Sequence, residues 1–269
     1  MKKINRRSFL AAAGLTAAAL ALTACGGSAS STASSTASSA AVSTSAAAEL
    51  TTVEAGKLTM ATNATFPPYE MTTDSGEIEG IDVDTAKAIA EKLGLELQID
   101  DMDFDAALLS VQQGKADIVM AGVTVTDERK AVMDFSDSYA TGIQSIIVPE
   151  GSDIASPDDL AGKKIGTQRG TTGYIYCSDD FGDDAVVAYD DGLTAVQALK
   201  NGQVDAVVID NAPAEEYVAA NPGLVILDTS YAEEDYAIGM AKGSALEDAV
   251  NAALEELKAD GTLQSIVDK

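Results

Sequence analysis

Residues 121–130 read AGVTVTDERK and follow the run DIVM at residues 117–120. An apolar run, a glycine, and then a threonine followed by two acids is the order expected for a buried strand, a turn and a helix start. We therefore predict that the chain turns at Gly122 and that a short helix begins after an N-cap at Thr126. The residues of this turn carry the strongest candidate chemistry in the chain.

Arg129 and the helix start beside it predict a binding site for a carboxylate. The first N–H groups of a helix lack intrahelical partners, and an arginine offers a planar fork of donors. The carbonyl of Gly122 and the hydroxyl of Thr124 are acceptors for a cation, so the stretch fits both charged ends of an amino-acid zwitterion. In the alternative interpretation, Arg129 is a surface side chain paired with Asp127 or Glu128.

Composition excludes several classes of function. The 269 residues include 43 acids and 17 bases, for a net charge of −26. Such a surface repels nucleic acid, so we expect no nucleic-acid partner. The chain has no histidine, which is the commonest general base and a common zinc ligand, and nothing in it predicts a metal or a cofactor.

The N-terminus has the pattern of an export signal. Residues 1–24 combine a basic start, an Ala/Leu-rich core at 9–22 and small residues before Cys25. That core is too short for a stable transmembrane helix. The sequence LTAC at 22–25 resembles a bacterial lipobox, which predicts lipidation of Cys25 and a lipid anchor in the cell membrane; an ordinary cleaved leader is the alternative. NRRSFL at 5–10 resembles a twin-arginine export motif, and the sequence leaves the export route open.

A tether is expected between the signal and the folded part. Residues 25–56 are dominated by Ser, Thr, Ala and Gly, which bury too little apolar surface to offset the entropy of folding. Cys177 is the only other cysteine. With Cys25 lipidated it has no partner, so we predict no disulfide and no catalytic cysteine.

Short apolar runs alternate with amphipathic segments from residue 57 onward. The predicted strands are 58–60, 118–121, 164–167, 204–209 and 225–227, and the predicted helices are 81–93, 106–113, 194–201 and 246–259. Such alternation predicts an α/β fold with mainly parallel sheets. Segments 109–122 and 197–210 also echo each other, each with a helix, a capping glycine, an aspartate and a buried strand. The echo indicates two similar lobes whose strand ends, Gly122 and Asp210, face a shared crevice.

Seven motifs then occur in a characteristic order and spacing: ATNATFPPYE (61–70), GIDVD (80–84), MDF (102–104), AGVTVTDERK (121–130), DFS (134–136), GTT (170–172) and VDAVVID (204–210). With them the chain resembles the amino-acid-binding solute receptors of ABC importers, the family that includes bacterial glutamine- and histidine-binding proteins. The resemblance implies a two-lobed, periplasmic-binding-protein-like α/β fold with two crossover strands as hinges. The implied parts are a signal peptide at 1–24, a lipidated tether at 25–56, lobe 1 at 57–141 plus 238–269, lobe 2 at 146–235, and hinges near 142–148 and 236–240.

The resemblance implies ten ligand-binding residues: Asn63, Phe66, Phe104, Gly122, Thr124, Arg129, Gln168, Thr171, Thr172 and Asp210. Arg129 would clamp the ligand α-carboxylate, with help from Thr124 and from N–H groups near Thr171 and Thr172, although that segment is also an ordinary turn and helix start. Asp210 and the acceptors of the turn at Gly122 and Thr124 would receive the α-ammonium. The alternative role for Asp210 is to cap the helix that follows it.

The side-chain end of the ligand is expected between Phe66 and Phe104, with its tip at Asn63 and Gln168. The two phenylalanines are core residues in the alternative interpretation. A receptor for a cationic ligand would be expected to keep an acid near Asn63, and one for an acidic ligand a base near Gln168. The implied site includes neither, and Arg169 lies in a variable loop, so we predict a neutral ligand, with polar side chains favoured.

The resemblance implies a monomeric extracytoplasmic receptor that captures a free L-amino acid and delivers it to an ABC-importer permease. It performs no chemistry of its own. Exported dehydratases that act on prephenate-like acids share the fold, and they are the enzyme alternative. A ligand-sensing module is the third class, and the sequence shows no signalling domain after Lys269 that would favour it.

Overall fold

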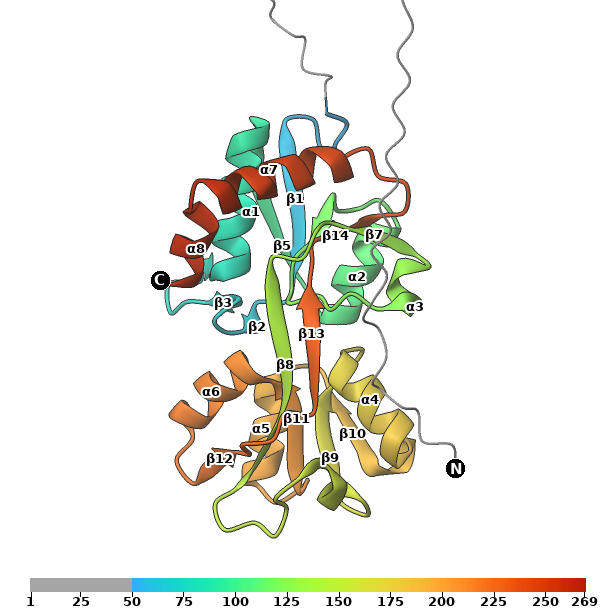
Figure 1. The fold of residues 1–269 in the computed structure, drawn as a ribbon, viewed down its shortest axis with the longest axis vertical. Helices are drawn as coiled ribbons and strands as arrows, with labels where there is room; N and C mark the ends of the chain where they lie inside the picture. The colour runs from blue at the N-terminus through green and yellow to red at the C-terminus, as the bar shows by residue number, and fades with distance from the viewer. Residues whose placement is uncertain (1–49) are drawn as a thin grey trace, which may run out of the picture. The chain divides into compact units, whose positions relative to one another are not determined.

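The computed structural model describes residues 50–269, which form two lobes joined by crossing strands (Figure 1). The predicted signal peptide, Cys25 and most of the predicted tether lie outside the described residues. Each lobe has its own sheet with helices packed against it, which is the predicted two-lobed α/β architecture. Among the described residues, no helix has the length and apolar character needed to cross a membrane.

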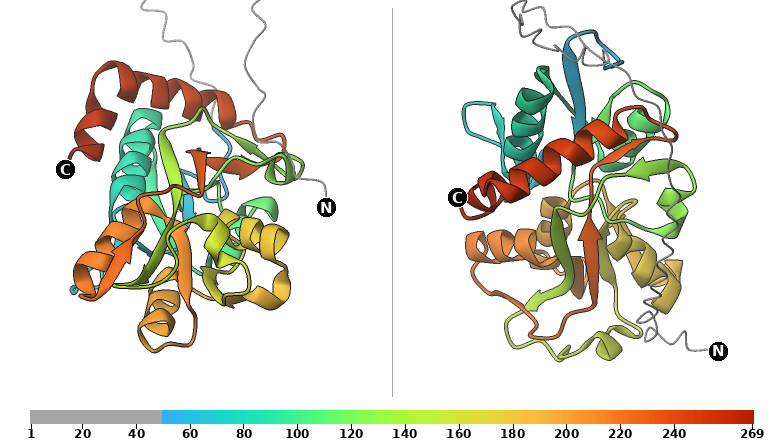
Figure 2. Two further views of the ribbon diagram at one scale, coloured as in Figure 1. Left: turned by 60° about the horizontal axis from the view of Figure 1, so that its bottom comes forward. Right: turned by 45° about the horizontal axis from the view of Figure 1, so that its top comes forward.

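The sheet of lobe 1 has the strand order β5-β1-β6-β14-β7. Its strands are β1 (Lys57–Thr62), β5 (Glu96–Asp101), β6 (Ile118–Val119), β7 (Met133–Phe135) and β14 (Gly239–Ala241), and its helices are α1 (Ile81–Leu93), α2 (Phe104–Gln112), α3 (Asp127–Lys130), α7 (Glu247–Ala259) and α8 (Thr262–Val267). β1 is buried along nearly its whole length, as expected for a central strand covered on both faces. Helices α7 and α8 pack against α1, and Figure 2 shows the C-terminal helices next to it.

A small antiparallel sheet of three strands belongs to lobe 1. It consists of β2 (Thr65–Phe66), β3 (Glu70–Thr72) and β4 (Ile78–Glu79). The chain turns from β4 into α1 through Gly80, whose φ of 137° favours glycine.

The sheet of lobe 2 has the order β10-β9-β11-β8-β12, with β13 also paired to β8. Its strands are β8 (Ala140–Pro149), β9 (Ile165–Gln168), β10 (Val186–Tyr189), β11 (Ala206–Asp210), β12 (Leu224–Ile226) and β13 (Ala232–Tyr236). Helices α4 (Thr172–Phe181), α5 (Gly192–Lys200) and α6 (Asn211–Ala220) pack on this sheet. Cys177 is a free, buried thiol in the core of lobe 2.

The sheets are mixed, so the prediction of mainly parallel sheets is wrong. Strands β5, β1 and β6 are parallel, as are β10, β9 and β11. Strands β14 and β8 run antiparallel to their neighbours. Both belong to the segments that cross between the lobes, and they enter their sheets from the opposite direction.

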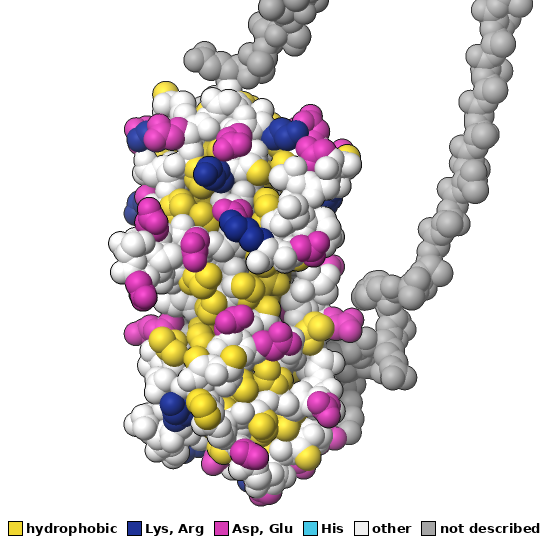
Figure 3. All heavy atoms as spheres, turned by 90° about the vertical axis from the view of Figure 1, so that its left-hand side faces the viewer, with side chains coloured by type: hydrophobic (Ala, Val, Ile, Leu, Met, Phe, Trp, Pro, Cys, Tyr) yellow, Lys and Arg dark blue, Asp and Glu magenta, His cyan; other side chains and the backbone are white. Residues whose placement is uncertain are grey.

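Helix limits follow the sequence closely. Helix α1 has its predicted limits and ends at Gly94, which adopts the left-handed conformation typical of a helix end. Helices α2, α5 and α7 differ from prediction by at most two residues at either end. Acidic side chains spread along both lobes on the face in Figure 3, in keeping with the net charge of −26.

Candidate functional site

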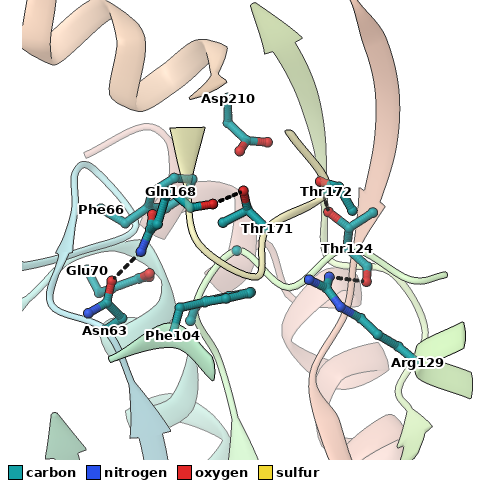
Figure 4. Close-up of a pocket in the computed structure, with 12 residues that line it drawn as sticks. Asn63, Phe66, Glu70, Phe104, Thr124, Arg129, Gln168, Thr171, Thr172 and Asp210 are labelled. Carbon is teal, nitrogen blue, oxygen red and sulfur yellow. Dashed lines mark hydrogen bonds between the residues drawn. The ribbon is translucent and has the colours of Figure 1, made fainter. Parts of the chain in front are cut away.

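One cavity between the lobes is lined by all ten residues of the predicted site. Its lining is Asn63, Phe66, Glu70, Phe104, Ala121, Gly122, Thr124, Arg129, Gln168, Thr171, Thr172 and Asp210, and Figure 4 shows most of these side chains. The free volume inside it is about 10 Å³, roughly the space that one water molecule needs. An amino acid is much larger than water, so its entry requires the lobes to separate.

Arg129 lines the cavity and is buried. The side chain is 9% exposed, and its guanidinium carbon lies 5.3 Å from the centroid of the Phe104 ring. Nη1 donates to the carbonyl of Thr124 at 2.8 Å, and Nη2 donates across the lobes to the carbonyl of Gly170 at 3.1 Å. Burial lowers the pKa of Arg129. The alternative of a surface ion pair is therefore wrong, and three of the five guanidinium N–H groups remain for a ligand.

The helix that carries Arg129 is too short to contribute much to binding a carboxylate. Helix α3 has four residues, and the predicted N-cap is confirmed because the Thr126 hydroxyl accepts from the Arg129 N–H at 3.1 Å. That cap already uses one of the helix-start donors. In one turn of helix the summed dipole is also small, so the guanidinium is the main source of positive charge here.

Asp210 lies at the end of β11 on the opposite lobe. It occupies the N-cap position of α6, but its side chain makes no capping hydrogen bond, which rules out the alternative role. Instead its carboxylate accepts a hydrogen bond from the hydroxyl of Tyr236. Burial, with the negative charge of Glu234 nearby, raises the pKa of Asp210 to about 7. A nearby cation would favour the ionised form, which suits a group that receives an ammonium.

Glu234, on the crossover strand β13, was not predicted and fixes the two threonines of the site. Its buried Oε2 accepts from the hydroxyls of Thr124 at 3.2 Å and Thr172 at 3.0 Å, and from Gln144 Nε2 at 2.9 Å. A carboxylate accepts only, so both hydroxyl protons point toward Glu234. The threonine oxygens are then left as acceptors, which fits the predicted contact of Thr124 with an ammonium better than its contact with a carboxylate.

Asn63 and Gln168 meet across the cavity. Gln168 Nε2 donates to Asn63 Oδ1 at 2.9 Å (Figure 4), and Asn63 Nδ2 donates to the carbonyl of Met102 at 2.9 Å. The hydroxyl of Thr171, the N-cap residue of α4, donates to the carbonyl of Gln168 at 2.8 Å and accepts from the N–H of Tyr174. The amide pair thus closes the end of the cavity away from Arg129.

Gly122 and Phe66 form another wall of the cavity. Gly122 has a φ of 55°, and a Cβ there would lie 2.7 Å from Cε1 of Phe66. The N–H of Gly122 donates to Asp82 Oδ2 at 3.0 Å, and the hydroxyl of Tyr139 donates to Asp82 Oδ1 at 2.7 Å. These bonds fix the Ala121–Gly122 peptide, which directly precedes the Gly122 carbonyl, the predicted ammonium acceptor. Burial raises the pKa of Asp82 to about 6.

Glu70 is a cavity residue that the sequence interpretation missed. It is fully buried, and it ends the motif ATNATFPPYE that marks the family. Burial and the adjacent Asp82 raise the pKa of Glu70 well above its usual range. The neutral-ligand prediction assumed that no acid lies near Asn63, and that assumption is wrong. Arg169 does not line the cavity, as expected. It lies at the surface, where its Nη2 is 3.6 Å from Asp190 Oδ1.

Among the described residues, no group of three or more potential metal ligands is present. The site combines two opposite charges, Arg129 and Asp210, with acceptors for an ammonium, two aromatic walls, an amide pair and the buried carboxyl of Glu70. This set suits the binding of a small zwitterion.

Comparison with known proteins gives the same picture. Residues 58–269 match the family model of bacterial extracellular solute-binding proteins, family 3. A probable histidine-binding protein of Neisseria gonorrhoeae is 33% identical over 274 residues, which cover 99% of this chain and 96% of the relative. The arginine-binding extracellular protein of Bacillus subtilis is 35% identical over 225 residues, covering 79% and 85%. A solved structure, an ancestral arginine-binding protein bound to glutamine, is 44% identical with a TM-score of 0.76, and the match covers 79% of this chain and 96% of that one.

Proposed function

We propose, because this chain belongs to the bacterial extracellular solute-binding proteins of family 3, that it captures a free L-amino acid between its lobes. The observation that carries the proposal is the placement of two buried, opposite charges, Arg129 and Asp210, which reach one cavity from different lobes. An α-amino acid carries the two complementary charges on adjacent atoms. Its binding would therefore complete the contact between the lobes.

In this proposal Arg129 holds the α-carboxylate with its remaining N–H groups, assisted by backbone N–H groups near Thr171 and Thr172. Asp210 receives the α-ammonium together with the Gly122 carbonyl and the Thr124 hydroxyl, whose proton is directed to Glu234. The desolvation of each ligand charge is offset by a buried partner of opposite sign.

The family assignment confirms the prediction of a binding protein rather than an enzyme, and it removes the dehydratase alternative. Relatives named for histidine, arginine and glutamine binding support an amino-acid ligand. We propose that the captured ligand passes to an ABC-importer permease on the extracytoplasmic side of the membrane.

Anchoring through a lipid on Cys25 is a further part of the proposal. The support is the LTAC sequence at 22–25 and the Ser/Thr-rich segment after it. Acyl chains would supply membrane affinity that a domain with this acidic surface lacks. Intact mass of the native protein tests this step: the expected mature chain starts at Cys25 and carries acyl mass, and a chain that starts elsewhere would disprove it.

The proposed ligand has a polar side chain whose tip contacts Asn63 and Gln168. Amides both donate and accept, which suits a neutral tip such as the amide of glutamine. A neutral preference is compatible with Glu70 when its carboxyl is protonated. One solved relative is an arginine-binding protein bound to glutamine, so the two side-chain classes are not exclusive in that protein.

Calorimetric titration with the twenty L-amino acids tests the function. At least one should bind, and the two analogues of that ligand that lack either charge should each bind much more weakly: the amide of its carboxylate and the deaminated acid. Loss of a buried charge partner typically weakens binding by roughly 30-fold or more. If an analogue binds as tightly as the amino acid, the assignment of the corresponding anchor is wrong.

A further inference from the structure

The two lobes also contact each other outside the ligand cavity, between helix α6 and the small sheet of lobe 1. The hydroxyl of Tyr217, on α6 of lobe 2, donates a hydrogen bond to the backbone carbonyl of Thr65, on β2 of lobe 1. Neither residue lines the cavity. The bond therefore differs from the interlobe bonds of Arg129 and Gln168, whose side chains do line it.

The carbonyl of Thr65 points out of its own sheet. β2 is an edge strand of the small sheet, which has the order β2-β3-β4. The carbonyl of Ala64 faces β3, because it accepts the N–H of Thr72 at 3.1 Å. Backbone groups alternate in direction along an antiparallel pair of strands, so the next carbonyl, that of Thr65, points away from β3. Tyr217 supplies this acceptor with a donor from the opposite lobe.

The ring of Tyr217 is held by its own lobe. Tyr217 is 6% exposed and belongs to the main apolar cluster. It lies beside Gly192 at the start of α5, where an added Cβ would be 3.2 Å from Cε2 of the ring. Helix α5 also packs against β2, so two elements of lobe 2 meet this strand. A ring that is already packed loses little further side-chain entropy when its hydroxyl forms a bond.

The strand that Tyr217 contacts carries one aromatic wall of the ligand cavity. Phe66 follows Thr65 in β2 and lines the cavity. The Phe66 ring stacks on Tyr69, with 5.8 Å between the ring centroids, and an added Cβ on Gly122 would lie 2.7 Å from it. Because β2 is short and lies at an edge, a bond from the opposite lobe limits how far Phe66 can move.

We propose that Tyr217 is a positioning residue of the closed protein: its bond to Thr65 holds β2 and Phe66 in place across the lobes and strengthens the binding of different amino acids by a similar factor. The inference rests on the proposed function, because it assumes that an amino acid binds between closed lobes. Separation of the lobes parts the hydroxyl from the carbonyl and leaves both to water. The identity of the ligand does not enter this exchange, because neither partner lines the cavity.

The variant Tyr217→Phe tests the proposal, because it removes the hydroxyl and keeps the ring. Calorimetry measures its affinity for L-glutamine, for L-arginine and for each other of the twenty L-amino acids that binds the unmodified protein. Loss of one hydrogen bond between neutral groups should weaken each of them by roughly fivefold. The ratio of affinities between any two ligands should stay within about twofold of its value in the unmodified protein.

Hydrogen exchange of the ligand-saturated protein shows where the substitution acts. The amides of β2 and β3 should exchange faster in Tyr217→Phe, although the substituted side chain belongs to the other lobe. A purely local loss of packing would instead raise exchange in α6 and leave these two strands unchanged. The matched control is Tyr231→Phe, which removes a hydroxyl that bonds Asp180 within lobe 2. The control should change neither the affinities nor the exchange of β2 and β3.

Unchanged affinity in Tyr217→Phe would overturn the proposal. A loss confined to one ligand would also overturn it, as would unchanged exchange in β2 and β3. If none of the twenty L-amino acids binds the unmodified protein, the proposed function itself fails.

Discussion

The hydroxyl of Tyr236 donates a hydrogen bond to the carboxylate of Asp210. The bond joins β13, a strand that crosses between the lobes, to the acid at the cavity end of β11. Tyr236 is fully buried, and its ring covers Gly142 on the other crossing strand, where an added Cβ would lie 2.4 Å from ring carbon Cε1. Any hinge movement that shifts this ring therefore changes the hydrogen bonding of Asp210.

Removal of that hydroxyl should weaken ligand binding in a pH-dependent way. In Tyr236→Phe, the ionised form of Asp210 loses a donor, and a hydrogen bond to a charged group contributes about 1.5–3 kcal/mol, so affinity at pH 7 should fall by roughly tenfold or more. The loss should be larger at pH 6.5 than at pH 8.5, because the pKa of Asp210 is already raised to about 7 and rises further without the donor. Titration calorimetry at both pH values measures it.

The control for this variant is Tyr231→Phe, which removes a hydroxyl bonded to Asp180 at the surface of lobe 2. Its affinity should stay close to that of the unmodified protein. A loss in Tyr236→Phe that is the same at every pH would show that the hydroxyl acts by packing and not through the charge of Asp210.

The unliganded protein should lose stability as pH rises from about 4 to 7. Burial raises the pKa of Asp82 to about 6 and that of Asp210 to about 7 in the folded state. Between the ordinary carboxyl pKa and these values the folded state holds more protons than the unfolded state, so a rise in pH favours unfolding. Denaturant unfolding at pH 4.5, 6 and 7.5 checks the slope.

The variant Asp210→Asn separates this effect from general repulsion among the surface acids. It should flatten the decrease in unfolding free energy between pH 4.5 and 7.5, because one of the raised groups can no longer ionise. A slope identical to that of the unmodified protein would mean that Asp210 does not hold its proton in the folded state.

Much of the fold could be predicted from the sequence because local signals were unambiguous. The limits of α1 follow from an amphipathic run between Gly80 and Gly94. The N-cap at Thr126 follows from a threonine with two acids directly after it. Strand direction could not be predicted in the same way, because β8 and β14 owe their antiparallel pairing to where the chain crosses between lobes.

The residues of the site were predicted from the sequence, but the hydrogen bonds among them were not. All ten expected residues line the cavity because family motifs locate them on strand ends and helix starts. Glu70 and Glu234 were missed, since an acid in a short strand has no local sign that tertiary packing will bury it. Glu70 is the last residue of the motif ATNATFPPYE, directly after Tyr69. Its place in a motif that supplies two other cavity residues was the available sign that it lines the cavity.

Gly80 should tolerate no side chain, because the turn into α1 leaves no room. A Cβ at this position would lie 2.2 Å from the carbonyl oxygen of Tyr69, which is backbone and cannot rotate away. Gly80→Ala should therefore lower the free energy of unfolding by about 3 kcal/mol and disturb the strand that begins at Glu70. Gly76→Ala is the control: its φ is also positive, at 85°, but a Cβ there meets nothing within 4 Å. If both variants lose the same stability, backbone conformation and not the contact with Tyr69 is the cause.

Arg129 should be the most sensitive single position for binding. Its guanidinium is buried against Phe104 and bridges the lobes through the carbonyl of Gly170, so in Arg129→Ala both the ligand carboxylate and this interlobe bond lose their partner. Unpairing a buried charge costs about 2–5 kcal/mol, which corresponds to an affinity loss of roughly 30-fold or more. Arg129→Lys should recover only part of the lost affinity, because an ammonium cannot donate to Thr124, Gly170 and a carboxylate in one plane.

Calorimetry on the folded variants measures the loss of affinity, and Lys130→Ala, at the exposed neighbouring position, is the control. Near-normal affinity in a folded Arg129→Ala protein would mean that the carboxylate binds elsewhere in the cavity.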